Sequence, residues 1–72
     1  MESHMKLLDV VAVTRDIPEH HLVRGQVGTI VEVLGAGAFE VEFSDDSGRT
    51  YAIAALKSAD LIVLSYKPAH AA

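Results

Sequence analysis

The chain contains no cysteine and no tryptophan, only two phenylalanines and two tyrosines, and few basic residues. Without cysteine it can form neither a disulfide nor a thiolate metal site. Its six lysines and arginines are scattered and are outnumbered by ten acidic residues, which gives a formal net charge of −4. Because no basic cluster is available to neutralise phosphates, this composition disfavours a nucleic-acid partner.

Long apolar runs are also absent from the sequence. No segment approaches the roughly 20 residues of a membrane-spanning helix, and none has the charged-then-apolar build of a signal peptide. We therefore expect a cytoplasmic protein with no membrane partner. Residues 1–4, MESH, read as vector-derived sequence ahead of a natural start at Met5, and they are left out of the fold argument.

A chain of 72 residues permits one small domain, which we expect at residues 5–66 with a flexible tail at 67–72. A core of this size rarely supplies more than about 3–5 kcal/mol of stability unless a disulfide, a metal or oligomerisation adds to it. Half of the residues are nonetheless hydrophobic, which is more than so small an interior can cover. Self-association into a dimer or a larger homo-oligomer is therefore expected.

The longest apolar β-pattern is the segment RGQVGTIVEVL, residues 24–34. Gly25 and Gly28 flank its entry, where glycine permits a positive φ or a close approach to a neighbouring strand. They do not form a phosphate loop, because no Lys-Ser or Lys-Thr follows and they precede a strand rather than a helix. Alternation alone leaves the buried face of this strand open, since a bulge near Gly28 would shift the register.

Four further strands are expected around this central one. Phe39, Val41 and Phe43 alternate with two glutamates, which predicts a strand with one face toward the core and one toward water. The other three are a first strand at 7–14, a strand at 49–56 with Tyr51, Ile53 and Ala55 inward, and a buried last strand at 61–64.

Short connections join these strands. Glycines favour a tight hairpin at 35–37 and a turn at 45–48, where Gly48 occupies the position that needs a positive φ. A single 3₁₀ turn fits residues 57–60. The order predicts an all-β fold, a small five-stranded SH3-like barrel with one 3₁₀ turn before the last strand.

The first long connection, residues 16–23, carries the candidate binding residues. Pro18 breaks the strand pattern and makes this a surface loop, with Ile17 and Leu22 as apolar pins that fold it over the end of the barrel. In SH3-like barrels a groove beside such a loop commonly takes a peptide. The candidate partner-binding residues are therefore Asp16, Ile17, Pro18, Glu19 and Tyr51. The alternative is that Asp16-Ile17-Pro18 only shapes and anchors the loop.

No catalytic, cofactor-binding or metal-binding residue is assigned. Adjacent His20 and His21 would point to opposite sides of an extended segment, and Glu40 and Glu42 fit a solvated strand face better than an acid and base pair. A barrel of this size also fills its interior with side chains and leaves no cavity for a substrate. We therefore expect a protein that is not an enzyme and needs no cofactor.

The segments LLDVVAV, DIPEH, RGQVGTIVEVL and FEVEF with DDSGRTYA resemble an uncharacterised family of small bacterial proteins, the domain of unknown function family 4926. The resemblance spans about Met5 to Leu64 and implies an SH3-like β-barrel without an established activity. RGQVGTIVEV is also, more weakly, similar to the glycine-centred KOW motif of ribosomal and transcription-elongation barrels. That second similarity implies a nucleic-acid binder that would use Arg24, Arg49 and Lys57.

The leading hypothesis is a non-enzymatic protein-interaction module that self-associates through an apolar sheet face or a strand edge. It would also bind a cognate protein, such as a small toxin-like protein encoded beside it. An acidic and compact chain is suited to bind such a partner. The alternative is the KOW-like nucleic-acid-binding barrel.

Overall fold

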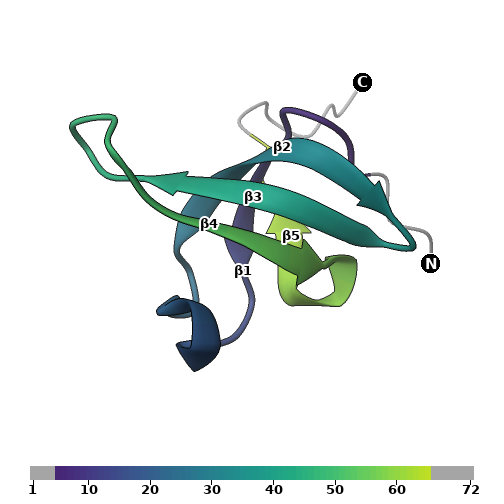
Figure 1. Ribbon diagram of the computed structural model, residues 1–72, viewed down its shortest axis with the longest axis horizontal. Coiled ribbons are helices and arrows are strands. Elements are labelled where there is room, and N and C mark those ends of the chain that lie inside the picture. Colours follow the sequence, from purple (N-terminus) through teal and green to yellow (C-terminus); the bar gives the residue numbers. More distant parts are fainter. Residues whose placement is uncertain (1–4, 66–72) are drawn as a thin grey trace, which may run out of the picture.

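The computed structural model describes residues 5–65, which form one antiparallel sheet of five strands in the order β4-β3-β2-β1-β5 (Figure 1). The strands are β1 (Val10–Val13), β2 (Val27–Gly35), β3 (Ala38–Ser44), β4 (Thr50–Lys57) and β5 (Leu61–Val63). A 3₁₀ helix η1 (Pro18–His20) lies between β1 and β2, and a second one, η2 (Ser58–Asp60), precedes β5. The predicted all-β class, the five strands and the 3₁₀ turn before the last strand are confirmed.

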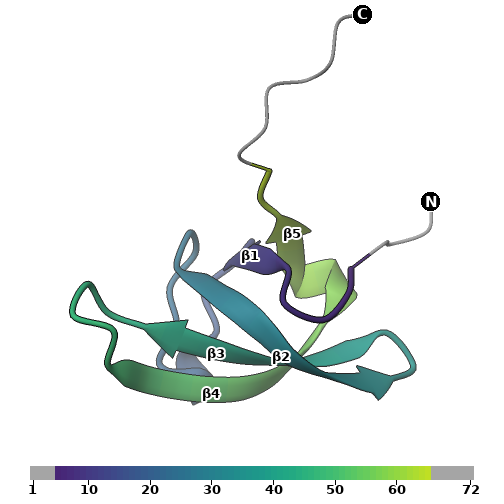
Figure 2. The same ribbon diagram turned by 90° about the horizontal axis from the view of Figure 1, so that it is seen from above.

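The long strand β2 connects the two halves of the sheet. It pairs with β3 along most of its length and with β1 near its start. Seen from above, β2 begins on the side of β1 and crosses β3 toward its far end (Figure 2). The sheet ends in two edge strands, β4 and β5, and no ladder joins them within residues 5–65.

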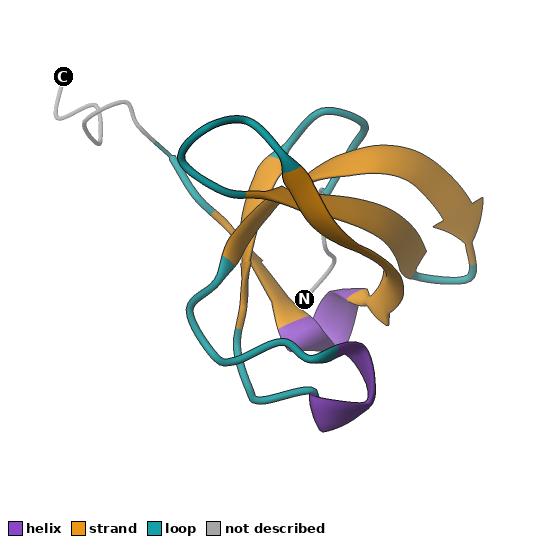
Figure 3. Ribbon diagram, turned by 60° about the vertical axis from the view of Figure 1, so that its left-hand side comes forward, coloured by secondary structure: helices purple, strands orange, loops and turns teal. Residues whose placement is uncertain are grey.

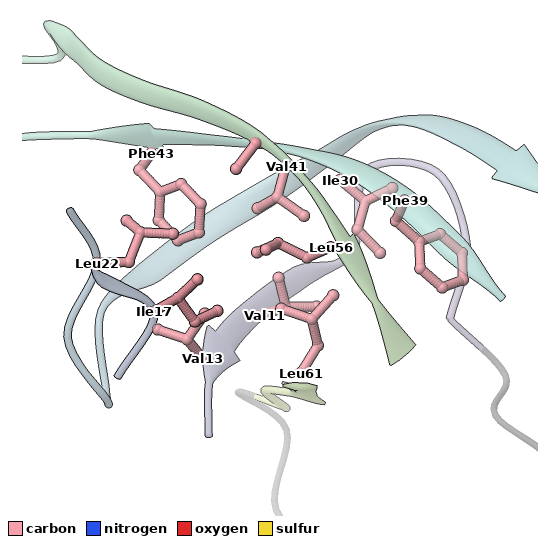
Figure 4. Packing of buried hydrophobic residues seen from close by; sticks show 11 residues of the cluster. Val11, Val13, Ile17, Leu22, Ile30, Phe39, Val41, Phe43, Leu56 and Leu61 are labelled. Atoms are coloured by element: carbon pink, nitrogen blue, oxygen red, sulfur yellow. The ribbon is translucent and has the colours of Figure 1, made fainter. Parts of the chain in front are cut away.

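The core lies on the concave side of this sheet (Figure 4). As predicted, Phe39, Val41 and Phe43 of β3 point inward, and the last two are completely buried. The loop residues Ile17 and Leu22 are each only 1% exposed, so they do fold the first loop over one end of the core. The remaining large buried side chains come from the other strands and are Val11, Val13, Ile30, Leu56 and Leu61.

The structure also decides which face of β2 is buried. Gly28 and Ile30 lie on the core side, opposite Phe43 and Val41 of β3. Two register shifts follow, one between Ile30 and Glu32 and the other between Val33 and Gly35. The first bulge sets Val33 opposite the buried Phe39, but the core does not cover this end of β2, and Val31, Val33 and Leu34 are between 39% and 53% exposed.

The three glycines singled out in the sequence have two different roles. Gly25 and Gly48 have positive φ values of 95° and 84°, as the turn prediction requires. Gly28 instead allows a close approach of strands: a Cβ there would lie 2.7 Å from Val41 Cγ1 and 2.8 Å from the Glu42 carbonyl oxygen. Both distances are shorter than real Cβ contacts, so a side chain at this position would force its neighbours to move.

The predicted inward face of the fourth strand is wrong. Tyr51, Ile53 and Ala55 are exposed, whereas Ala54 and Leu56 are buried. Ala52, Ala54 and Leu56 pair with the inward residues Phe43, Val41 and Phe39 of β3. Since those large side chains already fill the space above β3, small residues suffice on β4 at two of the three positions. A register shift between Phe43 and Ser44 leaves Tyr51 without a direct partner on β3.

The first and last strands are shorter than predicted. The first begins only at Val10, because Leu7 and Leu8 lie in a turn in which Leu8 has a φ of 72°. The last contains one buried residue, Leu61, while Ile62 and Val63 are 55% and 40% exposed. Residues 1–4, which the sequence indicates to be vector-derived, Tyr66 at the end of the expected domain and the tail expected at 67–72 lie outside the described residues.

Candidate functional site

The loop between β1 and β2 is a small ordered unit rather than an irregular surface loop. Pro18 begins η1, where its missing N–H would have had no helical partner in any case. Ile17 and Leu22 exchange two backbone hydrogen bonds of 2.8 and 3.1 Å, which close the unit. His21, with a φ of 58°, ends η1 and donates its backbone N–H to the Pro18 carbonyl. The signal for η1 was present in the sequence, as proline at the first helical position followed by an acidic residue.

The structure distributes the five candidate partner-binding residues over different surroundings. Asp16 accepts a hydrogen bond from the Arg24 backbone N–H at 2.9 Å and thereby ties the two ends of the loop together. Ile17 belongs to the core, while Pro18 and Glu19 are exposed on η1. Tyr51 lies on β4, with its ring 6.2 Å from that of Phe43. Partner binding by these residues remains a prediction, and the role of Asp16 and Ile17 within the loop is structural.

One cleft opens between this loop and the end of β4. Figure 3 shows both 3₁₀ helices at the same end of the sheet, and residues of both line the cleft. Its volume is about 230 Å³, below the roughly 300–1,000 Å³ typical of small-molecule sites. Of the candidate residues, Ile17 and Glu19 reach it, whereas Asp16, Pro18 and Tyr51 do not. The full lining is Arg15, Ile17, Glu19, His20, Ala55, Leu56, Lys57 and Asp60.

An ion pair holds one wall of the cleft. Arg15 donates from Nε to Asp60 Oδ1 at 2.8 Å and from Nη2 to Asp60 Oδ2 at 3.2 Å. The backbone joins the same two segments, since the Thr14 N–H donates to the Asp60 carbonyl at 2.9 Å. The hydrogen bonds from Arg15 lower the pKa of Asp60 and raise that of the Arg15 guanidinium. Asp60 is therefore a structural anion at neutral pH and a poor proton donor.

This ion pair predicts a measurable titration. With its folded pKa below the unfolded value, ionised Asp60 stabilises the fold above about pH 4, and this contribution disappears as the pH falls through the folded pKa. We expect the carboxyl carbon of Asp60 to titrate, by NMR, at a lower pH than a model aspartate. Arg15→Gln should move that midpoint up toward the model value.

Lys57→Gln provides the matched control, because Lys57 acts on the same carboxylate only through a weaker long-range attraction. It should move the Asp60 midpoint less than Arg15→Gln does. Equal shifts in the two variants would show that charge alone, and not the two hydrogen bonds, sets this pKa.

Residues 5–65 contain no group of three or more histidine, aspartate or glutamate side chains placed to share a metal ion. Glu42 accepts a hydrogen bond from the Thr50 hydroxyl on the outer face of the sheet. One of the two strand glutamates therefore has a partner within the sheet. Within the same residues, neither 3₁₀ helix is long or apolar enough to cross a membrane.

The most unusual property of the surface is its apolar content. Eleven large hydrophobic side chains of the described residues are at least 39% exposed, almost as many as the twelve hydrophobic residues that are buried. Some lie on the convex face, where Val27 of β2 and Ile62 of β5 flank Ala12 of β1 in register. Others lie on the edge strand β4. The full set is Leu7, Leu8, Val23, Val27, Val31, Val33, Leu34, Tyr51, Ile53, Ile62 and Val63.

These features define a small all-β domain with one open sheet, a shallow cleft at one end and an apolar outer surface. The chain belongs to the family described as a domain of unknown function, DUF4926, whose model matches residues 7–63. No curated protein and no solved structure gives a significant match. The family description names no activity.

Proposed function

We propose that this protein is a non-enzymatic interaction module that self-associates through its apolar outer surface and also binds a cognate protein, such as a toxin-like neighbour. The observation that supports the proposal is the exposure of eleven large apolar side chains on so small a domain. Monomeric proteins rarely expose contiguous apolar patches of more than a few hundred Å². Covering this surface would add the stability that a core of this size does not supply alone.

The cleft is suited to a peptide or a side chain of a partner rather than to a free metabolite. It is small, and its lining combines the apolar Ala55 and Leu56 with charges of both signs. The partner-binding role of Glu19 on its rim belongs to this proposal, as does that of Pro18 and Tyr51 nearby on the surface.

The alternative is a KOW-like nucleic-acid binder that would use Arg24, Arg49 and Lys57. Arg49 and Lys57 flank β4 at its opposite ends. Strand geometry separates such positions by about 25 Å, at roughly 3.3 Å per residue, so these two cations form no single cluster for a phosphate backbone. No observation on the structure favours this alternative over the interaction module.

One experiment separates the two functions. The tagged chain, residues 5–72, is used to capture partners from lysate of its host, with and without nuclease and at low and high salt. The interaction module predicts a stoichiometric protein that survives nuclease and high salt, because apolar contacts are not weakened by salt. Recovery that depends on nucleic acid and falls steeply with salt would contradict the module and support phosphate binding instead.

Sedimentation of the purified chain tests the self-associating part separately. We expect the average mass to rise with protein concentration and to change little between low and high salt. A mass that stays monomeric at every concentration would contradict self-association, whatever the lysate yields.

A further inference from the structure

The edge strand β4 has few of the features that normally protect a strand edge. Natural sheets protect exposed edges with short strands, proline, bulges or charged residues. β4 has eight residues and lacks proline, and its only charged residue is Lys57 at its end. The one irregularity is the register shift near Thr50. The opposite edge, β5, has only three residues.

The free hydrogen-bonding groups of β4 can be assigned from the ladder. The Ser58 N–H donates to the Gly37 carbonyl at 2.8 Å, one step beyond the pair of Lys57 with Ala38. Antiparallel ladders alternate between bonded and non-bonded pairs. The backbone groups of Ala54 therefore face β3, and those of Ile53, Ala55 and Lys57 face away from it. Within residues 5–65, β4 makes no backbone hydrogen bond to any segment other than β3.

We propose that a second copy of this chain occupies the β4 edge, so that two β4 strands pair antiparallel about a two-fold axis and the two sheets become one. This inference rests on the proposed function and names the surface through which self-association occurs. It is an isologous contact, in which each copy uses the same strand. The outward-facing Ile53, which is 56% exposed, lies close to the axis on the convex face.

Charge favours a second copy on this strand. Two chains that each carry a formal charge of −4 repel one another over most of their surface, whereas β4 carries no acidic residue. An antiparallel two-fold contact aligns the uncharged stretch between Arg49 and Lys57 with itself. Parallel pairing in register would instead place Lys57 beside Lys57 of the partner subunit, and like charges directly opposite destabilise a ladder.

The positions of Lys57 and Arg49 also select the register. Pairing Ile53 with the partner's Ala55 brings Ala54 onto the axis and sets Lys57 opposite the partner's Tyr51, where a cation can contact the aromatic ring. This register also brings Lys57 toward the end of the partner's β4 that lies beside the partner's Glu42. A shift by two residues would pair Ile53 with itself and place Lys57 against Arg49 of the partner subunit.

In this register the cleft becomes part of the contact. Ala55 and Lys57 line the cleft, and the partner's residues 51–53 run alongside them. The added strand would thus form a further wall of the cleft. A single strand pair gives a small interface, so we expect weak association, detectable at chain concentrations between about 10 μM and about 1 mM.

The test compares two variants of equivalent isoleucines. Ile53 on β4 and Ile62 on β5 are 56% and 55% exposed, so Ile53→Lys and Ile62→Lys introduce the same charge at equally accessible edge-strand positions. Sedimentation of the full chain should show that Ile53→Lys weakens dimerisation at least about tenfold, because the two lysines would lie diagonally across the axis, each opposite Ala55 of the partner subunit. Ile62→Lys should dimerise like the wild type.

Two further measurements fix the geometry. Ala55→Pro should also abolish the dimer while the monomer stays folded, because the N–H that proline removes points away from β3. Residue-resolved hydrogen exchange should show that the amides of Ile53, Ala55 and Lys57 become protected as concentration rises, whereas that of Ala54 is protected throughout.

The outcomes distinguish the β4 contact from the proposed self-association. Loss of the dimer in Ile62→Lys but not in Ile53→Lys would overturn the β4 contact and leave the proposed self-association intact, now through the convex face. A wild-type chain that is monomeric up to about 1 mM would overturn both claims. A third outcome is a chain that never dimerises but captures a different protein, with that capture lost in Ile53→Lys. It would assign the β4 edge to the other protein and overturn the proposal of a second copy.

Discussion

Replacing Phe43 with alanine is expected to leave the chain largely unfolded at 25 °C. The ring is completely buried and lies in register between Gly28 on β2 and Ala52 on β4. Neither neighbour has a side chain long enough to fill the cavity, so little relaxation is available. Truncations of this kind cost about 3–5 kcal/mol, which matches the whole stability expected of so small a core. Urea unfolding followed by circular dichroism measures the loss.

Tyr51→Ala is the matched control for Phe43→Ala. Both changes remove one of two aromatic rings that contact each other, but Tyr51 is 46% exposed. Its removal should cost about 1 kcal/mol or less, the usual value for an exposed aromatic contact. If Tyr51→Ala were as damaging as Phe43→Ala, the outward position of Tyr51 would be wrong.

Replacing Gly28 with alanine is the second large effect. An added Cβ would lie 2.7 Å from Val41 Cγ1, 2.9 Å from Phe43 Cδ2 and 2.8 Å from the Glu42 carbonyl oxygen. The two side chains could shift, but the carbonyl belongs to the β3 backbone and cannot move without disturbing the β2–β3 ladder. We expect a loss of about 3 kcal/mol, at the upper end of the range for overpacking, measured as a lower urea midpoint.

Gly48→Ala separates this steric effect from the effect of removing a glycine. Gly48 has a φ of 84° and no neighbour within 4 Å of an added Cβ. The only cost there is the left-handed conformation, about 1–2 kcal/mol for a residue with a Cβ. A Gly28→Ala variant no less stable than Gly48→Ala would show that β2 and β3 are farther apart at this point than the structure has them.

The sequence predicts the fold because most of its strands carry a simple signal. Phe39, Val41 and Phe43 alternate cleanly with glutamates, and the glycine turns end their strands where expected. On the fourth strand the predicted inward face is the wrong one: Tyr51 and Ile53 are exposed, whereas Leu56 and the small Ala54 are buried. Which side of β4 is buried depends on how much space β3 leaves, and that is a property of the pair, not of either strand alone.

The candidate site was predicted less well, for a related reason. Ile17 and Leu22 could be identified as pins because two apolar residues in a polar loop have few other uses. The cleft could not be predicted, since Arg15 and Asp60, which hold its wall, are 45 positions apart in sequence. Nor does the alternation show that β4 is an edge, because edge and central strands can carry the same apolar pattern until the sheet order is known.

The ladder between β1 and β5 has a consequence for how the molecule acquires its structure. The β2-β3-β4 meander consists of hairpins whose partners are near in sequence, whereas Val11 must find Val63 across almost the entire chain. The entropy lost in closing that long loop is recovered only when Leu61 enters the core. The meander is therefore expected to form early and the terminal ladder late. Until that last step, a chain emerging from the ribosome would display its concave apolar face as well as the edge of β4, and it would depend on fast closure to avoid misassembly.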